Sequence, residues 1–118
     1  MQVSITGRHM ELTDALRDHA QSRLEKLNSE FPRLQSAHIV LDVEKHRQMA
    51  EVVVHAPNHV VVDANEETSD LYASIDGAVD KATKQLRRIR DKMVDHKSQE
   101  SLGEMEAQLE ARQGDAGS

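Results

Sequence analysis

Apolar and polar residues alternate along four short stretches of the chain, and this two-residue period predicts β-strands. The predicted strands are residues 2–6, ended by Gly7, and residues 36–44, 49–56 and 60–64. Residues 45–48 and the pair Pro57-Asn58 separate the last three strands and are typical of turns. We therefore expect the last three strands to form an antiparallel meander.

The register of the first predicted hairpin follows from its two apolar sets. Pairing Glu44 with Met49 places Ile39 opposite Val54 and brings both apolar sets onto one face of the sheet. The opposite face is then polar. The apolar face must be covered by other elements.

Two segments carry their apolar residues three and four positions apart, which predicts amphipathic helices. The first stripe is Leu12, Ala15, Leu16, Ala20, Leu24 and Leu27, and the second is Ile75, Val79, Ala82, Leu86, Ile89 and Met93. Thr13 is the expected N-cap of the first helix, which ends before Pro32. Ser69 is the expected N-cap of the second helix, with Asp70 in its first turn, and this helix extends to about Lys97.

The predicted order β-α-β-β-β-α indicates an α+β fold. A four-stranded sheet with one apolar face and two helices with one apolar stripe each fit a two-layer sandwich, with both helices on the same face. Residues 1–97 hold all of these elements and are predicted to form one domain. Residues 98–118 are rich in Glu, Gln, Gly and Ser and are predicted to be an acidic, disordered tail.

The net charge of −6 argues against a polyanionic partner until it is divided by segment. Residues 98–118 contain five acidic residues and one arginine, a net charge of −4. Residues 1–97 contain 14 Lys and Arg against 16 Asp and Glu. The predicted domain is thus nearly neutral, and its binding properties depend on whether its charges are mixed or segregated.

Positive charges are segregated on both predicted helices. At 100° per residue, the basic flank of the second helix spans about 80° and consists of Lys81, Lys84, Arg88 and Lys92, whereas Asp76, Asp80 and Asp91 lie on the other flank. The first helix carries His19, Arg23 and Lys26 on one side and Asp14, Asp18 and Glu25 on the other. Two such flanks, if they adjoin, would bind phosphate backbone rather than base sequence, and neighbouring arginines add forked guanidinium groups.

A solvated helix face is the alternative explanation for each basic flank. Pairs such as Asp80 with Lys84 would then contribute about 0.3–0.5 kcal/mol each to helix stability. Periodicity alone leaves both explanations open.

Other functions find less support in the sequence. One Phe, one Tyr and no Trp leave little for base stacking, and the absence of Cys excludes disulfides and thiolate metal sites. His38, expected opposite His55 with His59 nearby, is better explained as part of a polar sheet face than as a metal ligand. No glycine-rich phosphate loop or nucleophile elbow is present, so we expect no enzyme. No signal peptide or apolar run of about 18 residues is found, and we expect a cytoplasmic protein.

Several motifs in a fixed order carry a family resemblance. The opening Met1-Gln2-Val3-Ser4-Ile5-Thr6-Gly7 is followed by Glu11-Leu12-Thr13-Asp14-Ala15-Leu16-Arg17 and Lys26-Leu27, and later by Asp70-Leu71-Tyr72-Ala73-Ser74-Ile75-Asp76, Asp80-Lys81 and Gln85-Leu86. Together they cover about residues 1–97 and resemble the ribosome hibernation promoting factors, once called sigma-54 modulation proteins. His59 departs from the pattern, because it stands at a turn position where relatives often have Gly.

The resemblance implies a fold similar in shape to a double-stranded RNA-binding domain. It also implies binding to the 16S rRNA of the 30S ribosomal subunit, in the channel of mRNA and of the A- and P-site tRNAs. Binding there inhibits translation under stress or in stationary phase. No cofactor, DNA or membrane partner is implied, and the free protein is expected to be a monomer. At 118 residues the chain is too short for the dimerising domain of the long family form.

The family's RNA-contacting positions match both basic flanks. The matching residues are Arg23 and Lys26 on the first helix and Lys81, Lys84, Arg88, Arg90 and Lys92 on the second, with Arg87 at a more variable position. These eight residues are the predicted RNA-binding site, and no catalytic or metal-binding residue is predicted.

The acidic tail and the partner leave alternatives open. The tail is either solubilising disorder, a competitor of RNA for the basic face, or a contact to a neighbouring ribosomal surface. Its length resembles inhibitor-type relatives that oppose ribosome pairing, whereas the opening motif resembles the short promoting type. A protein-interaction module and a general binder of structured RNA are the two other functions to be tested.

Overall fold

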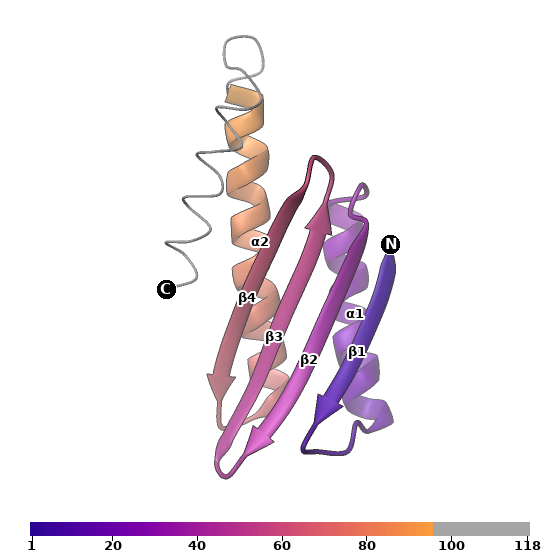
Figure 1. Ribbon diagram of the computed structural model, residues 1–118, viewed down its shortest axis with the longest axis vertical. Coiled ribbons are helices and arrows are strands. Elements are labelled where there is room, and N and C mark those ends of the chain that lie inside the picture. The colour runs from indigo at the N-terminus through magenta and orange to yellow at the C-terminus, as the bar shows by residue number, and fades with distance from the viewer. Residues whose placement is uncertain (96–118) are drawn as a thin grey trace.

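The computed structural model describes residues 1–95; the predicted acidic tail lies outside the described residues. The elements are β1 (Gln2–Arg8), α1 (Asp14–Glu30), β2 (Ser36–Glu44), β3 (Arg47–Ala56), β4 (Val60–Thr68) and α2 (Leu71–Asp95). This is the predicted order β-α-β-β-β-α (Figure 1). Within residues 1–95 no helix is both long and apolar enough to cross a membrane.

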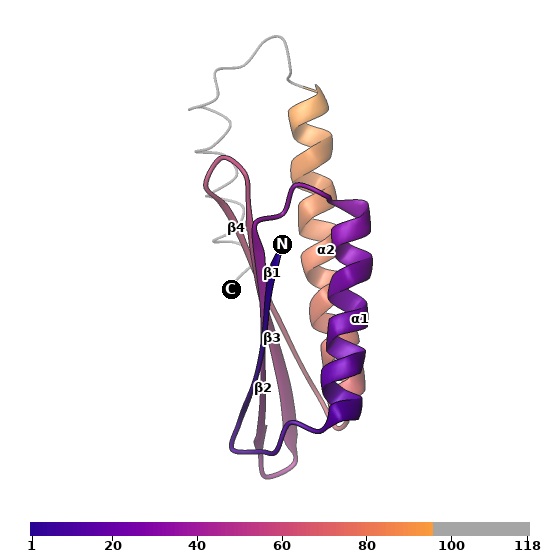
Figure 2. The ribbon, with the colours of Figure 1, turned by 90° about the vertical axis from the view of Figure 1, so that its right-hand side faces the viewer.

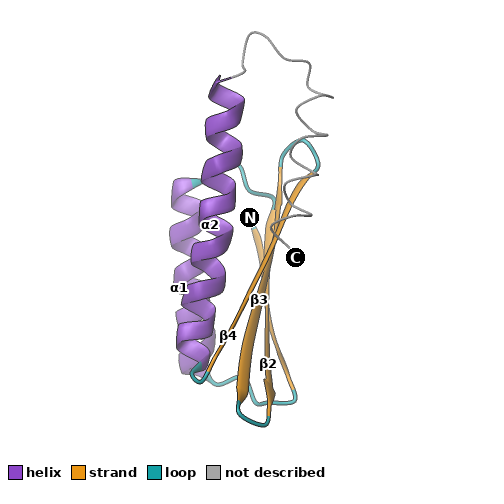
Figure 3. Ribbon diagram, turned by 90° about the vertical axis from the view of Figure 1, so that its left-hand side faces the viewer, coloured by secondary structure: helices purple, strands orange, loops and turns teal. Residues whose placement is uncertain are grey.

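The four strands form a single sheet in the order β1-β2-β3-β4. β1 runs parallel to β2, and the β2–β3 and β3–β4 pairs are antiparallel. Both helices lie on the same face of this sheet, as Figures 2 and 3 show from its two sides. The predicted two-layer α+β sandwich is therefore confirmed.

The core lies between the sheet and the two helices. Alternate residues of β2, β3 and β4 face the helices and are buried: Ala37, Ile39, Leu41, Ala50, Val52, Val54, Val60, Val62 and Ala64. Most of the two predicted helical stripes meets them, with Leu24 and Ile75 fully buried, whereas Ala15 is exposed. Each large apolar side chain buried here contributes roughly 1.5–3 kcal/mol and holds the helices on the sheet.

The β2–β3 register differs by two residues from the predicted one. Glu44 pairs with Arg47 rather than with Met49, and the connection is the two-residue turn Lys45-His46. Lys45 adopts a φ of 56°, as tight hairpin turns require, and such turns match the twist of the strands better than the predicted four-residue loop. Because the shift is an even number of residues, the predicted face remains buried.

The first helix begins and ends as predicted. Thr13 is the N-cap, and its hydroxyl oxygen accepts a hydrogen bond from the backbone N–H of Leu16 at 3.2 Å. The helix stops at Glu30, two residues before Pro32. The N-cap preference of Thr13 and the helix-breaking effect of Pro32 thus predict both ends of this helix correctly.

The prediction of Ser69 as N-cap of α2 is wrong by one residue. The Asp70 carboxylate accepts a hydrogen bond from the backbone N–H of Tyr72 at 3.2 Å, so Asp70 precedes the first turn rather than lying in it. The Thr68 hydroxyl accepts from the Asp70 N–H at 3.0 Å, and β4 continues to Thr68. This side-chain turn places Ser69 in the connection rather than at the helix.

The β3–β4 turn contains two consecutive residues in the left-handed region. Asn58 has a φ of 65° and His59 a φ of 63°. This conformation is easy for Gly and costs other residues roughly 1–2 kcal/mol. The backbone thus accounts for the Gly expected at the position of His59.

Candidate nucleic-acid interface

The two helices run parallel and side by side, and their polar side chains meet along one line. The contacts recur at a constant separation of 57 residues. His19 lies 2.8 Å from Asp76, Arg23 lies 2.5 Å from Asp80, and Glu30 lies 2.6 Å from Arg87. We call this line the interhelical seam, consisting of His19, Arg23 and Glu30 of α1 and Asp76, Asp80, Arg87 and Arg90 of α2.

The charge pattern of the seam reverses along its length. At the middle of α1, Arg23 faces the carboxylates Asp76 and Asp80 of α2, at 3.3 and 2.5 Å. Near the end of α1, the acidic residue belongs to α1 and the basic residues belong to α2. The basic flank of α1 therefore adjoins the acidic flank of α2. The condition for a merged basic patch, that the two basic flanks adjoin, is thus not met along the seam.

Glu30 holds two of the predicted RNA-binding arginines. Its carboxylate accepts hydrogen bonds from Arg87 Nε at 2.6 Å and Nη2 at 2.8 Å, and Arg90 Nη1 lies 3.7 Å away. The hydrogen bond from Arg87 lowers the pKa of Glu30, against a smaller desolvation effect, and the same bond raises the pKa of Arg87. The Arg90 guanidinium also lies 5.0 Å from the centre of the Phe31 ring, a cation–π contact.

Lys81 is exposed but lies outside the seam and has partners on β4. Its Nζ donates to the backbone carbonyl of Asn65 at 3.0 Å and lies 3.4 Å from the Glu66 carboxylate. These contacts connect α2 to β4 on the side away from α1. About half of the Lys81 side chain stays exposed, at 51%, so it can still meet a partner at this edge.

Three of the eight predicted residues are exposed and form no ion pair among residues 1–95: Lys26, Lys84 and Arg88. We call them the open cations. Lys84 and Arg88 project from the side of α2 opposite its buried stripe. The 57-residue offset places Lys26 level with Thr83, next to Lys84. Lys84 and Arg88 therefore lie on the outer face of the helical layer, and Lys26 is exposed beside the seam. Lys92 is half-buried and has an interaction partner of its own.

The sequence did not reveal Glu30 as part of this region. Nothing in its spacing to Arg87 indicates a contact, because the two residues are 57 positions apart on different helices. The packing of α1 beside α2 determines the offset, and that packing depends on the whole core. The only usable signal was charge complementarity, which fits many pairs equally well.

The outer face of the sheet has a different character. His38 pairs with Val53 rather than with the predicted His55, although the two imidazole rings still lie 6.1 Å apart, edge to face. Glu51 lies beside Asp63, whose carboxyl group raises the pKa of Glu51. Among residues 1–95, no group of three or more His, Cys, Asp and Glu is arranged to hold a metal ion. This acidic face is unsuited to a polyanion.

Comparison with known proteins places this geometry in a family. Residues 3–94 match the family described as sigma 54 modulation protein / S30EA ribosomal protein. The ribosome hibernation promoting factor of Klebsiella oxytoca is 41% identical over 96 residues, covering 81% of this chain and 100% of that protein. The factor of the same name from Escherichia coli K12 is 38% identical with the same coverage.

Solved structures agree with this assignment. The N-terminal domain of Protein Y from Thermus thermophilus superposes with a TM-score of 0.68 at 36% identity, covering 75% of this chain and 98% of that one. A ribosomal subunit interface protein from Coxiella burnetii gives a TM-score of 0.72 at 22% identity, covering 77% and 99%, and supports the fold alone. The resemblance seen in the sequence motifs is thus confirmed, and the chain belongs to the sigma 54 modulation protein / S30EA ribosomal protein family.

Proposed function

We propose that this protein is a ribosome hibernation factor that binds the 16S rRNA of the 30S subunit in the channel of mRNA and of the A- and P-site tRNAs. Occupation of that channel inhibits translation under stress or in stationary phase. The relatives named ribosome hibernation promoting factors support the role. The proposed activity is binding and steric exclusion, with no catalytic step.

The observation that carries the proposal is the exposure of Lys26, Lys84 and Arg88 on the helical layer, with no ion-pair partner within residues 1–95. An unpaired cation loses little when it meets a phosphate, and each contact releases counterions from the nucleic acid. The seam beneath these residues fixes the two helices relative to one another. The open cations are therefore presented on two helices that contact each other and the sheet.

The five remaining residues of the proposed RNA-binding site contribute under different conditions. Arg23, Arg87 and Arg90 already have carboxylate partners, so a phosphate must share or displace them. Lys81 is half exposed beside β4 and can reach a phosphate at that edge. Lys92 belongs to the same basic flank of α2 as Lys84 and Arg88. We rank the open cations first, Lys81 and Lys92 next, and the seam arginines last in their contribution to affinity.

Co-sedimentation with purified 30S subunits at graded salt tests the proposal. We expect stoichiometric binding at low salt that weakens steeply as salt increases, because condensed counterions are displaced from the rRNA. A plain RNA duplex serves as the competitor. Absence of association at low salt would refute the proposal, and equal affinity for the duplex would indicate a general binder of structured RNA. Binding that is insensitive to salt would instead favour a protein-interaction module.

A further inference from the structure

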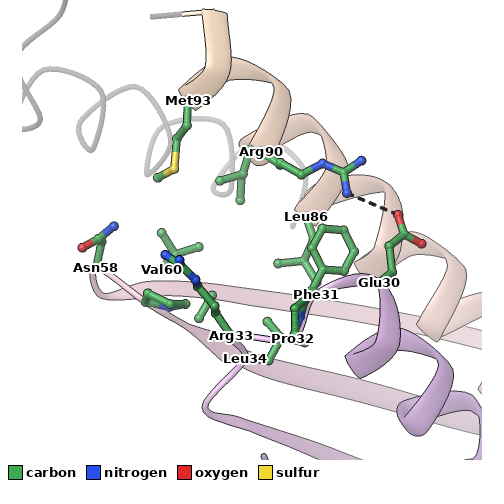
Figure 4. A pocket seen from close by; sticks show the side chains of 13 residues that line it. Glu30, Phe31, Pro32, Arg33, Leu34, Asn58, Val60, Leu86, Arg90 and Met93 are labelled. Atoms are coloured by element: carbon green, nitrogen blue, oxygen red, sulfur yellow. Dashed lines mark ion pairs between the residues drawn. The ribbon is translucent and has the colours of Figure 1, made fainter. Parts of the chain in front are cut away.

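An apolar pocket of about 490 Å³ lies at the end of the sandwich where α1 and β3 stop and β4 starts. Leu34, Val60, Leu86, Ile89 and Met93 contribute to its lining. Figure 4 shows Met93 reaching down from α2 on one side, with Asn58, Val60 and residues 31–34 on the other, and Arg90 extending along the rim toward Glu30. Its volume falls within the roughly 300–1,000 Å³ of typical ligand pockets, so it can accept several apolar side chains.

The rim of this pocket carries two arginines, Arg33 and Arg90, and one carboxylate, that of Glu30. Arg33 is exposed and forms no ion pair among residues 1–95. Arg90 is 48% exposed and lies 3.7 Å from Glu30, whose carboxylate is already engaged by two shorter hydrogen bonds from Arg87. An apolar cavity with two cations at its edge fits an occupant that combines apolar and acidic side chains.

The chain following α2 has this composition. Leu102, Met105 and Leu109 are three and four residues apart, and at 100° per residue they span only about 60° of a helical projection. They are the large apolar residues of positions 98–118, and glutamates surround them at positions 100, 104, 106 and 110. No opposing cation other than Arg112 occurs in this stretch. The segment therefore complements the pocket in both hydrophobicity and charge.

We propose that residues 100–110 dock in this pocket of their own chain, with Leu102, Met105 and Leu109 inserted and the glutamates facing Arg33 and Arg90. The connection is long enough. Met93, in the last turns of α2, lines the pocket, and the seven residues from Asp95 to Leu102 can span up to about 23–25 Å. Docking in the same chain also benefits from the high effective concentration that a short connection provides.

The docked segment would have a regulatory consequence that rests on the proposed function. Arg90 belongs to the proposed RNA-binding site, and the acidic segment would cover it and lower the positive potential beside Arg88. RNA binding and docking would then compete. The docking itself takes place in the free protein, and its test needs no ribosome.

A single spin label in the full-length chain tests the docking directly. The chain has no cysteine, so Gly103→Cys gives one labelling site within the segment. We expect the nitroxide to reduce the amide signals of Leu34 and Val60, while those of Lys45 and His46 at the opposite end of the sheet keep their intensity. Uniform intensities at both ends would overturn the proposal.

Two further samples make the result specific. In the labelled chain, Leu102→Ser, Met105→Ser and Leu109→Ser together should restore the signals of the pocket, whereas the matched change Ala107→Ser should not. Failure of the triple variant to restore them would overturn the insertion of these three side chains. Mixing labelled chains with unlabelled, isotope-enriched chains should leave the signals intact, and a loss of intensity there would mean docking onto a second copy and refute the same-chain arrangement.

The regulatory consequence has its own readout. The triple variant, without the label, should bind 30S subunits several-fold more tightly than the parent chain. If the label experiment succeeds and the affinity does not change, docking stands and the competition is wrong. If neither protein binds 30S subunits, the proposed function fails while the docking result remains valid.

Discussion

The seam arginines and the open cations lie on the same two helices but have different surroundings. Arg23 and Arg87 are held by carboxylates at 2.5–2.8 Å, across the interface between α1 and α2. Lys84 and Arg88 project outward with no ion pair within residues 1–95. The first group connects the helices, and the second remains available to a partner. A count of basic residues therefore overstates the binding surface.

Charge reversal of the open cations should have the largest effect. We expect Lys84→Glu with Arg88→Glu to weaken 30S binding by at least about 100-fold, because each charge-assisted contact contributes about 1.5–3 kcal/mol. The thermal unfolding midpoint should change little, since neither side chain has an ion-pair partner in the described residues. Co-sedimentation and thermal unfolding measure the two effects.

A matched control carries the same change in net charge elsewhere. Arg17→Glu with Lys45→Glu alters two exposed cations, one on the other side of α1 and one in the β2–β3 turn. This variant should retain most of its 30S binding. Equal losses in both double variants would mean that net charge rather than the open cations determines affinity.

Removing a seam cation should have the opposite effect, with a larger loss of stability and a smaller loss of 30S binding. Arg23→Gln breaks contacts to Asp76 and Asp80, and we expect the free energy of unfolding to fall by roughly 1 kcal/mol, as for a good surface ion pair. Its loss of 30S affinity should be smaller than that caused by Lys84→Gln. Urea denaturation and 30S binding measurements on both variants test whether Arg23→Gln loses more stability and Lys84→Gln loses more affinity. A stable Arg23→Gln protein with the greater binding defect would contradict the comparison.

Neutralising Glu30 should convert seam cations into open ones. Glu30→Gln removes the carboxylate that holds Arg87 and Arg90, so 30S affinity should rise a few-fold while stability at neutral pH falls. The pKa of Glu30 is lowered mainly by Arg87, so its contribution is present above the ordinary pKa of 4.5 and lost as pH falls through the lower folded value. Unfolding measured between neutral pH and pH 3 should show a flatter pH dependence for the variant than for the parent chain.

Replacing Glu51 should have the smallest effect, and it should stabilise the protein, whereas replacing Glu30 destabilises it. Asp63 raises the pKa of Glu51, so ionised Glu51 destabilises the fold above that pKa and the penalty disappears as pH falls through it. Glu51→Gln should therefore stabilise the protein at pH 7 by roughly 0.2–1 kcal/mol, as expected for relieving like charges on one sheet face. Because this residue lies on the sheet face away from the helices, 30S binding should not change. A loss of binding would mean that the sheet face takes part.

The sequence predicted those parts of the fold that depend on local chemistry. Alternation and three-four spacing identified the strands and helices of residues 1–95, and Thr13 and Pro32 bounded α1. The β2–β3 register was missed because shifts by two residues bury the same face, and only the turn at Lys45 distinguishes them. The N-cap of α2 was missed because a Thr68 side-chain turn competes with it.

The candidate site was harder to predict from the sequence than the fold, because ion pairs between the helices depend on tertiary packing. Helical projection correctly separated the outward residues Lys84 and Arg88 from the buried stripe. It could not establish which cations have partners, since the carboxylates of Asp80 and Glu30 reach them across an interface whose offset is set by core packing. Whether a charge is available for binding is a tertiary property.

The salt dependence of 30S affinity tests the distinction between seam and open cations most directly. The plot of log K against log salt should become shallower by about 0.7–0.9 for each phosphate contact removed. We predict that Lys84→Gln with Arg88→Gln lowers the slope by about 1.4–1.8, whereas Arg23→Gln with Arg87→Gln changes it by less than half as much. A seam variant that reduces the slope as much as the open-cation variant would contradict the account.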